Sequence, residues 1–270
     1  MRKRVRIALV AVPVAVIGVL GWQVLRERQP VYQGKRLSVW LEQYGTNHWA
    51  AGRGGELDRQ AETAIRQIGT NTIPIYLSII TARDSPFKLK LLALVPRQWQ
   101  ARLNLHSVND VRHLGAYGLI ALGAEAKPAV PTLISLVNEK DPEVRYTAVF
   151  ALRSLGPVAR DALPALIACL QDPDFRVQSD AILGLGELQQ DPERVVRILI
   201  EVLDKPQNSQ HVAIIRGDAI WSLRQFGTQA KAAVPSLLRL LNDEQEGIRS
   251  EATNSLRMID PEAAAKAGVK

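Results

Sequence analysis

Four histidines and one cysteine are the side chains of this 270-residue chain best suited to metal binding or nucleophilic chemistry. A metal site on one helix would place two histidines four residues apart, or repeat a His-Glu pair, so that the ligands share a face. His48, His106, His113 and His211 form no such pair, and we interpret each as a solvated or hydrogen-bonded side chain. Cys169 stands in an apolar stretch, which predicts a small core residue and not a nucleophile.

Acidic and glycine-rich motifs point to no chemistry either. The run Asp243-Glu244-Gln245-Glu246 lacks the alternating oxygen ligands of a calcium-binding loop. The sequence contains neither a Gly-x-Ser-x-Gly nucleophile motif nor a phosphate-binding Gly-x-x-x-x-Gly-Lys loop. We therefore predict that the protein is not an enzyme and that it has no catalytic, cofactor-binding or metal-binding site.

The net charge of +7 is concentrated at the N-terminus. The first 30 residues contain six basic residues and one acidic residue, whereas the remaining 240 contain 28 basic and 26 acidic residues. A nucleic-acid-binding domain usually carries its basic excess on the folded body, because neutralising phosphates supplies much of its affinity. The nearly neutral body predicts that nucleic acid is not a partner, and we keep nucleic-acid binding only as a second alternative.

Residues 1–30 have the pattern of a signal anchor. Residues 7–25 form an uncharged, apolar stretch that as a helix would match the roughly 30 Å hydrocarbon core of a bilayer. Four basic residues precede it and Trp22 lies near its far end, which predicts a cytoplasmic N-terminus and a periplasmic body on a single transmembrane helix. The alternative is a cleaved signal peptide and a secreted body.

The body repeats with a period of 33 residues. Equivalent residues of the first two copies are Val111 and Val144, Gly123 and Gly156, and Pro131 and Pro164. The series continues at Val177, at Ile215 after a five-residue insertion, and at Ile248. Such regularity is typical of stacked repeat architectures.

Each copy predicts two helices. Val144, Ala148, Ala151 and Leu155 follow a helical period and would form one apolar stripe. Gly156 would end that helix, because glycine adopts the left-handed conformation at little cost. Each pair would bury its apolar faces against its neighbours.

The repeat resembles HEAT repeats, in particular the HEAT-like units named from phycobilisome (PBS) lyases. The pattern that carries this resemblance is Asp141-x-x-Val144-Arg145-x-x-Ala148-x-x-Ala151-Leu152, followed by an Ala-x-Pro helix start. The resemblance implies an all-α solenoid of about five to six helix pairs, like those of membrane-anchored bacterial HEAT-repeat proteins. It also implies a polar ladder between repeats made by Asp141, Arg145, Asp174, Arg216 and Arg249, with Gln178 interrupting it.

We accordingly predict three regions: the anchor at 1–30, a capping helix and loop at 31–56, and the solenoid at 57–270 with an insertion at about 84–110. The predicted function is a non-enzymatic scaffold that binds another protein and is tethered to the membrane through residues 7–25. The alternative that the resemblance implies is a lyase-like enzyme or enzyme subunit. The oligomeric state stays open.

Two sets of residues are candidates for partner binding. The insertion combines basic side chains with a tryptophan, which would suit an acidic protein or anionic lipid headgroups, or would lie on the solenoid as a solvated loop. Second helices of stacked repeats commonly line the concave face where partners bind. The candidates are, in the insertion, Lys88, Lys90, Arg97, Trp99 and Arg102, and on the second helices Thr132, Ser135, Glu201, Ser236 and Arg239.

Overall fold

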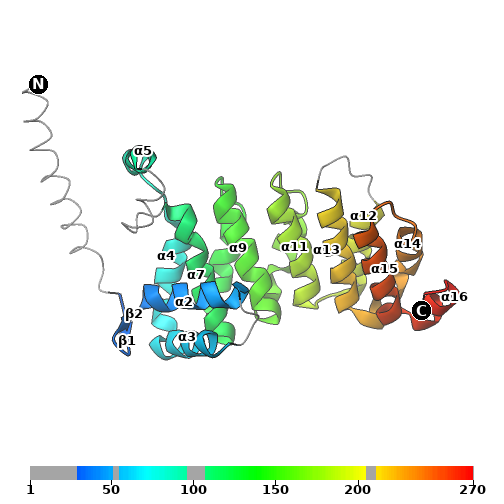
Figure 1. Cartoon of the computed structure of the whole chain (residues 1–270), viewed down its shortest axis with the longest axis horizontal. Helices are drawn as coiled ribbons and strands as arrows, with labels where there is room; N and C mark the ends of the chain where they lie inside the picture. The colour runs from blue at the N-terminus through cyan, green and yellow to red at the C-terminus, as the bar shows by residue number, and fades with distance from the viewer. Residues whose placement is uncertain (1–28, 51–54, 96–106, 205–210, 270) are drawn as a thin grey trace, which may run out of the picture. The chain divides into compact units, whose positions relative to one another are not determined.

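The computed structural model describes residues 29–50, 55–95, 107–204 and 211–269, most of them helical (Figure 1). The predicted transmembrane segment, residues 7–25, lies outside the described residues. The chain divides into two compact units, residues 1–68 and residues 69–270.

The described part of the first unit is a small hairpin followed by two helices. β1 (Val31–Tyr32) pairs antiparallel with β2 (Lys35–Arg36), and α2 (Leu37–Ala50) and α3 (Glu56–Ile68) follow. The hairpin turn has positive φ at both central residues, Gln33 (48°) and Gly34 (75°), as a tight two-residue turn requires. The indole N–H of Trp40 donates to the carbonyl of Tyr32 at 3.1 Å, which joins the hairpin to α2.

The second unit contains α-helices and short 3-10 helices (η), with no β-strand among its described residues. Its elements are η1 (Thr70–Thr72), α4 (Ile73–Thr81), α5 (Pro86–Leu94), α7 (Val108–Leu122), η2 (Gly123–Ala129), α8 (Val130–Leu136), α9 (Pro142–Leu155), η3 (Gly156–Ala162), α10 (Leu163–Cys169), α11 (Phe175–Leu188), α12 (Pro192–Asp204), α13 (Val212–Gln225), η4 (Gly227–Ala233), α14 (Val234–Leu240), α15 (Glu246–Ile259) and α16 (Pro261–Lys266).

The first helices of the repeats pack side by side in sequence order. α7 packs on α9, α9 on α11, α11 on α13 and α13 on α15 (Figure 1). α4 follows a 3-10 helix and has a proline in its first turn, as α8, α10 and α14 do, and it packs on α7. The second helices α8, α10, α12 and α14 each pack against the first helix of the next repeat. This confirms the predicted all-α solenoid.

The repeat period places the predicted apolar stripe in the core. On α9, Val144 is 2% exposed, and Ala148, Ala151 and Leu152 are fully buried. The side chain of Asp141 caps this helix, because it accepts a hydrogen bond from the backbone N–H of Glu143 at 3.0 Å. Small residues on the stripe let neighbouring helices approach closely, which produces the tight stack.

Glycine starts the connection between the two helices of three repeats. Gly123, Gly156 and Gly227 have φ of 58°, 52° and 52°, and a 3-10 helix leads from each into the second helix. The repeat that contains α11 and α12 differs. Gln189 takes the equivalent position with φ of 49°, Asp191 has φ of 43°, and α12 begins directly at Pro192.

Candidate partner-binding surfaces

The polar ladder between repeats is present, and its residues hold the stack together. Arg112, which is 3% exposed, contacts Asp141 at 3.2 Å, and Arg145 contacts both carboxylate oxygens of Asp172 at 2.7 and 2.9 Å. The partner of Arg145 is therefore Asp172. Asp174, which the resemblance placed in the ladder, caps α11 by accepting from the N–H of Arg176 at 2.9 Å.

Gln178 replaces an arginine but keeps half of its role. Its side-chain amide donates to the carbonyl of Asp172 at 2.6 Å, just as Arg145 donates to the carbonyl of Glu139 at 2.9 Å and Arg249 to that of Asp243 at 2.8 Å. The contact with the preceding turn thus survives the substitution. The cationic charge does not, because an amide side chain is neutral.

The predicted residues of the insertion are only partly described. Arg97, Trp99 and Arg102 lie outside the described residues. Lys88 and Lys90 lie on α5, and the ammonium of Lys88 contacts the carboxylate of Asp84 at 2.5 Å. Lys90 is exposed.

The predicted residues of the second helices have two different environments. Thr132 and Ser135 on α8 and Glu201 on α12 are exposed. Ser236 on α14 is only 4% exposed, because its hydroxyl contacts the carboxylate of Asp204 on α12 at 3.2 Å. Arg239 contacts the same carboxylate at 2.5 Å. Ser236 therefore connects two repeats and is not available to a partner. Arg239 also connects the two repeats, but its side chain is largely exposed and could contact a partner.

A row of aromatic rings lies on the partly exposed face of the first helices α7 and α9. The sequence analysis did not predict it. The ring of Tyr117 on α7 lies 5.2 Å from that of His113 and 6.1 Å from that of Phe150 on α9. Tyr146 lies 6.5 Å from Phe150, and the guanidinium of Arg176 on α11 lies 5.1 Å from the Tyr146 ring. Except for His113, which is exposed, these side chains are half-buried. We call these five residues the aromatic row.

The sequence contained a signal for the aromatic row. Tyr117 and Phe150 are 33 residues apart, as are His113 and Tyr146, so they occupy equivalent positions in consecutive repeats. Recurrence of a ring at one repeat position predicts that the rings of these two repeats lie side by side.

Next to the aromatic row, two carboxylates are partly removed from water between α9, α11 and α13. Asp180, which is 6% exposed, forms an ion pair with Arg153, and its second oxygen has no hydrogen-bond partner among the described residues. The hydroxyl of Ser179 donates to the carboxylate of Asp218 at 2.5 Å. Burial raises the pKa of Asp218 to about 6, although the bond from Ser179 opposes this, and burial also raises the pKa of Asp180 against the effect of Arg153.

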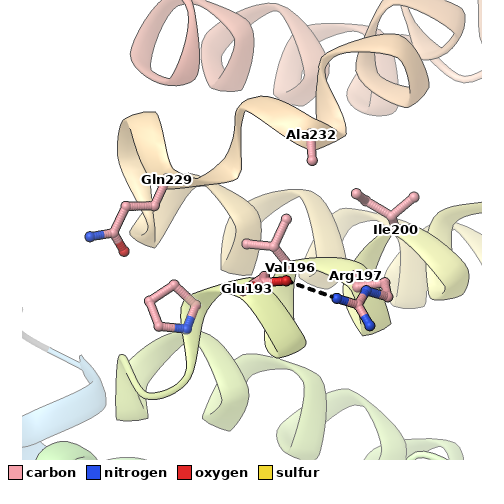
Figure 2. A pocket seen from close by; sticks show the side chains of 7 residues that line it. Glu193, Val196, Arg197, Ile200, Gln229 and Ala232 are labelled. Atoms are coloured by element: carbon pink, nitrogen blue, oxygen red, sulfur yellow. Dashed lines mark hydrogen bonds and ion pairs between the residues drawn. The ribbon is translucent and has the colours of Figure 1, made fainter.

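A hollow of about 460 Å³ lies between α12 and η4 (Figure 2). α12 begins without a preceding 3-10 helix at this point. The repeats that contain Gly123, Gly156 and Gly227 have such a 3-10 helix before their second helix. Val196 and Ile200 of α12 face Ala232 across it, and Glu193 forms an exposed ion pair with Arg197 at 3.1 Å on its rim. Its remaining lining residues are Pro192 and Gln229. The lining is thus apolar at its centre, with Glu193, Arg197 and Gln229 as its polar residues.

Residues that could hold a metal ion do not gather in the described part of the chain. No three side chains of histidine, cysteine, aspartate or glutamate lie close enough there to share an ion. Cys169 is buried, and burial raises the pKa of its thiol to about 11, which disfavours the reactive thiolate.

One helical run of the described residues, Val111–Leu136, is long and apolar enough to cross a membrane by length and composition, with a hydropathy of 1.3. It comprises α7, η2 and α8. Because α7 and α8 both pack against α9, we assign this run to the solenoid.

The comparisons with known proteins support the repeat family. Residues 130–215 match the HEAT repeats family, and residues 215–243 match the PBS lyase HEAT-like repeat. None of the curated proteins matches the sequence significantly.

Several solved structures are similar to parts of the chain. An engineered protein is 16% identical, with a TM-score of 0.49 over 86% of this chain and 97% of its own. The complex of CpcE and CpcF of phycocyanin lyase from Nostoc sp. PCC7120 is 24% identical, with a TM-score of 0.46 over 57% of this chain and 62% of that chain. A designed armadillo repeat protein is 14% identical, with a TM-score of 0.43 over 83% and 100%.

Proposed function

We propose that the protein is a non-enzymatic scaffold whose repeat stack binds another protein, and that residues 7–25 tether it to the membrane with the repeats outside the cytoplasm. The aromatic row is the observation that carries the proposal. Aromatic side chains and arginine are the residue types most enriched at the centres of protein interfaces. Here Tyr117, Tyr146, Phe150 and Arg176 combine these types across three helices.

The stack supports this function by holding the rings in place before a partner arrives. Phe150 lies on the same helix as Val144 and Leu152, whose side chains are buried in the core. A preorganised surface loses less conformational entropy on binding than a flexible one, so more of the contact energy contributes to affinity.

Affinity capture from detergent-solubilised membranes tests the proposal and identifies the binding face. The full chain is compared with a Tyr117→Ala, Phe150→Ala variant and with a Thr132→Ala, Ser135→Ala control on the second helices. We expect the unmodified chain and the control to capture the same protein, and the aromatic variant to lose it while keeping its helical circular dichroism. Capture of no protein by the unmodified chain would refute the scaffold, and loss of the partner only in the control would move the site to the second helices.

The tether has its own test. We expect the full chain to remain in the membrane fraction after an alkaline wash, and a variant without residues 7–25 to become soluble. External protease should degrade the repeats of intact spheroplasts. Protection of the repeats, or membrane association without residues 7–25, would contradict this topology.

A lyase-like enzyme or enzyme subunit is the second candidate, because residues 215–243 match the PBS lyase HEAT-like repeat. It predicts that the purified chain binds a bilin chromophore and gains visible absorbance. A chain that stays colourless with the chromophore but captures a protein would favour the scaffold.

A further inference from the structure

A second set of ion pairs connects consecutive first helices near their C-terminal halves. Arg153 on α9 pairs with Asp180 on α11. Arg224 on α13 pairs in the same way with Glu251 on α15, at 3.2 Å. In both pairs the acid follows the arginine by 27 residues, so the two pairs occupy equivalent positions of the repeat.

The equivalent pair between α11 and α13, which lie side by side in Figure 1, lacks its arginine. When the five-residue insertion is allowed for, Gly186 occupies the arginine position and Asp218 the acidic position. A Cβ added at Gly186 would lie 2.9 Å from the Cα of Ser222, so α13 packs too closely for a larger side chain there. Within the described part of the chain Asp218 forms no ion pair, and its hydrogen bond comes from the hydroxyl of Ser179.

Two carboxylates therefore share one arginine at this place. Asp180 repels Asp218, and Arg153 attracts it. Asp180 is only 6% exposed, and its second oxygen accepts no hydrogen bond from any described residue. The remaining arginines of α9, α11 and α13 already contact other acids. These contacts are Arg145 with Asp172, Arg176 with Glu143 and Asp174, Arg216 with Asp243, and Arg224 with Glu251. One negative charge is left without a counter-ion, on the partly exposed side chain of Asp218.

Open space adjoins this charge on α13. Gly217 lies inside the helix, and a Cβ added there would meet no atom within 4 Å. Glycine weakens a helix relative to alanine, and at this position neither a turn nor a close packing contact requires it. Trp221, which is half-buried, follows Gly217 by four residues and Asp218 by three, so its ring neighbours both positions. The space over Gly217 thus lies beside a carboxylate and an indole ring.

We propose that the protein partner places a lysine or arginine side chain over Gly217, with its charge beside the carboxylate of Asp218 and its stem on the ring of Trp221. This inference rests on the proposed function and extends the binding surface from the aromatic row to α13. The partner's cation would take the role of the arginine that Gly186 replaces. Tryptophan is the aromatic ring that attracts such cations most strongly.

A metal ion fits the same place less well. Calcium and magnesium take six or more oxygen ligands, whereas one of the two carboxylates here is already paired with Arg153. The described residues also hold no group of three acidic, histidine or cysteine side chains that could share an ion. An organic cation needs only the one free carboxylate and the ring.

Fluorine NMR of the full chain in detergent tests the site with a defined probe. The protein is labelled with 5-fluorotryptophan, and the signal of Trp221 is assigned by its loss in Trp221→Phe. We expect this signal to shift with Nα-acetylarginine amide, and not with Nα-acetylcitrulline amide, which has nearly the same shape and no charge. Asp218→Asn should weaken the binding of the arginine amide by about fivefold, as loss of a partly exposed ion pair does, whereas Asp161→Asn should not.

A second variant tests the space itself. Gly217→Leu should abolish the shift, because its side chain would occupy the place of the probe. Gly247→Leu on α15 is the matched control, since a Cβ added at Gly247 also meets no atom within 4 Å. Both variants should keep the helical circular dichroism of the unmodified chain.

Several outcomes would overturn the proposal. Equal shifts with the arginine and citrulline amides, or no shift with either, would remove the role of charge. A shift with calcium chloride and none with the arginine amide would make the place a metal site. Undiminished capture of the protein partner by Asp218→Asn would mean that the partner does not use this site. Capture of no protein by the unmodified chain would refute the proposed function, whereas the titration with arginine amide would still show whether the site accepts a cationic side chain.

Discussion

Replacing Asp218 by asparagine should stabilise the protein at neutral pH. Asp218 lies between α11 and α13, where it accepts a hydrogen bond from Ser179 and is repelled by the carboxylate of Asp180. Burial raises its pKa from 3.8 to about 6, so the folded protein holds this proton more tightly than the unfolded chain does. The stability that this proton contributes is complete below about pH 4 and is lost as the pH rises through 6.

The size of the effect follows from the pKa shift. A difference of about two pKa units corresponds to about 3 kcal/mol, and partial access of water to the carboxylate reduces this to about 1–2 kcal/mol. Asparagine keeps an oxygen that can accept from Ser179 and carries no charge at any pH. We therefore expect the Tm of Asp218→Asn to exceed that of the unmodified chain by about 2–6 °C at pH 7.

Thermal unfolding of the full chain at a series of pH values measures this. The difference in Tm between the two proteins should shrink from pH 7 towards pH 4, where Asp218 is protonated in the folded state. The pKa of Asp180 is also raised, so Asp180 makes both proteins less stable as the pH increases. The pKa of Asp174 is lowered by Arg176, so its effect on stability falls below its ordinary pKa of 3.8. Asp161→Asn, at an exposed site, is the control and should change little. A lower Tm for Asp218→Asn at pH 7, or a difference that does not depend on pH, would refute this reasoning.

Three further substitutions test the packing of the stack by chemical denaturation. Gln189→Gly should raise the free energy of unfolding by about 0.5–1 kcal/mol, because Gln189 has φ of 49° where other repeats use glycine. A decrease would show that its side chain makes a stabilising contact. Gly118→Ala should lower the free energy of unfolding by about 1–3 kcal/mol, because the added Cβ would lie 2.5 Å from the ring of Tyr76. An unchanged midpoint of denaturation would mean that α4 and α7 separate easily. Arg112→Ala should cost about 1–3 kcal/mol, since the carbonyl of Ile80 loses its buried donor and the partly exposed carboxylate of Asp141 loses its cation. An unchanged free energy of unfolding would mean that solvent replaces the arginine.

The helix pairs could be predicted because each depends on neighbours in sequence. A helix cap such as Asp141 acts on the next two residues, and the apolar stripe that includes Val144 and Leu152 repeats every three or four positions. The end of the helix at Gly156 is likewise a local property of the chain, and the structure confirms it with a φ of 52°, although ψ is −129° and the residue is not left-handed helical. The partner of Arg145 could not be assigned in this way, because Asp172 and Asp174 stand two residues apart in one turn and only the backbone of that turn decides which of them faces the arginine.

The candidate surface was harder to predict than the fold. Ser236 occupies a position that is exposed on α8 as Thr132, yet it is buried, because Asp204 of the preceding repeat accepts its hydrogen bond. Ser236 and Asp204 are 32 residues apart in the sequence, so local pattern could not predict their contact.

The sequence by itself determined the repeat length, the alternation of first and second helices and the identity of the core residues, because these follow from periodicity and local capping. The tertiary structure decided which side chains meet across repeats. Tyr117 and Phe150 belong to different helices, and their rings lie 6.1 Å apart only because α7 packs beside α9. The packing of α11 between α9 and α13 likewise excludes water from Asp180, which no single segment of the chain determines.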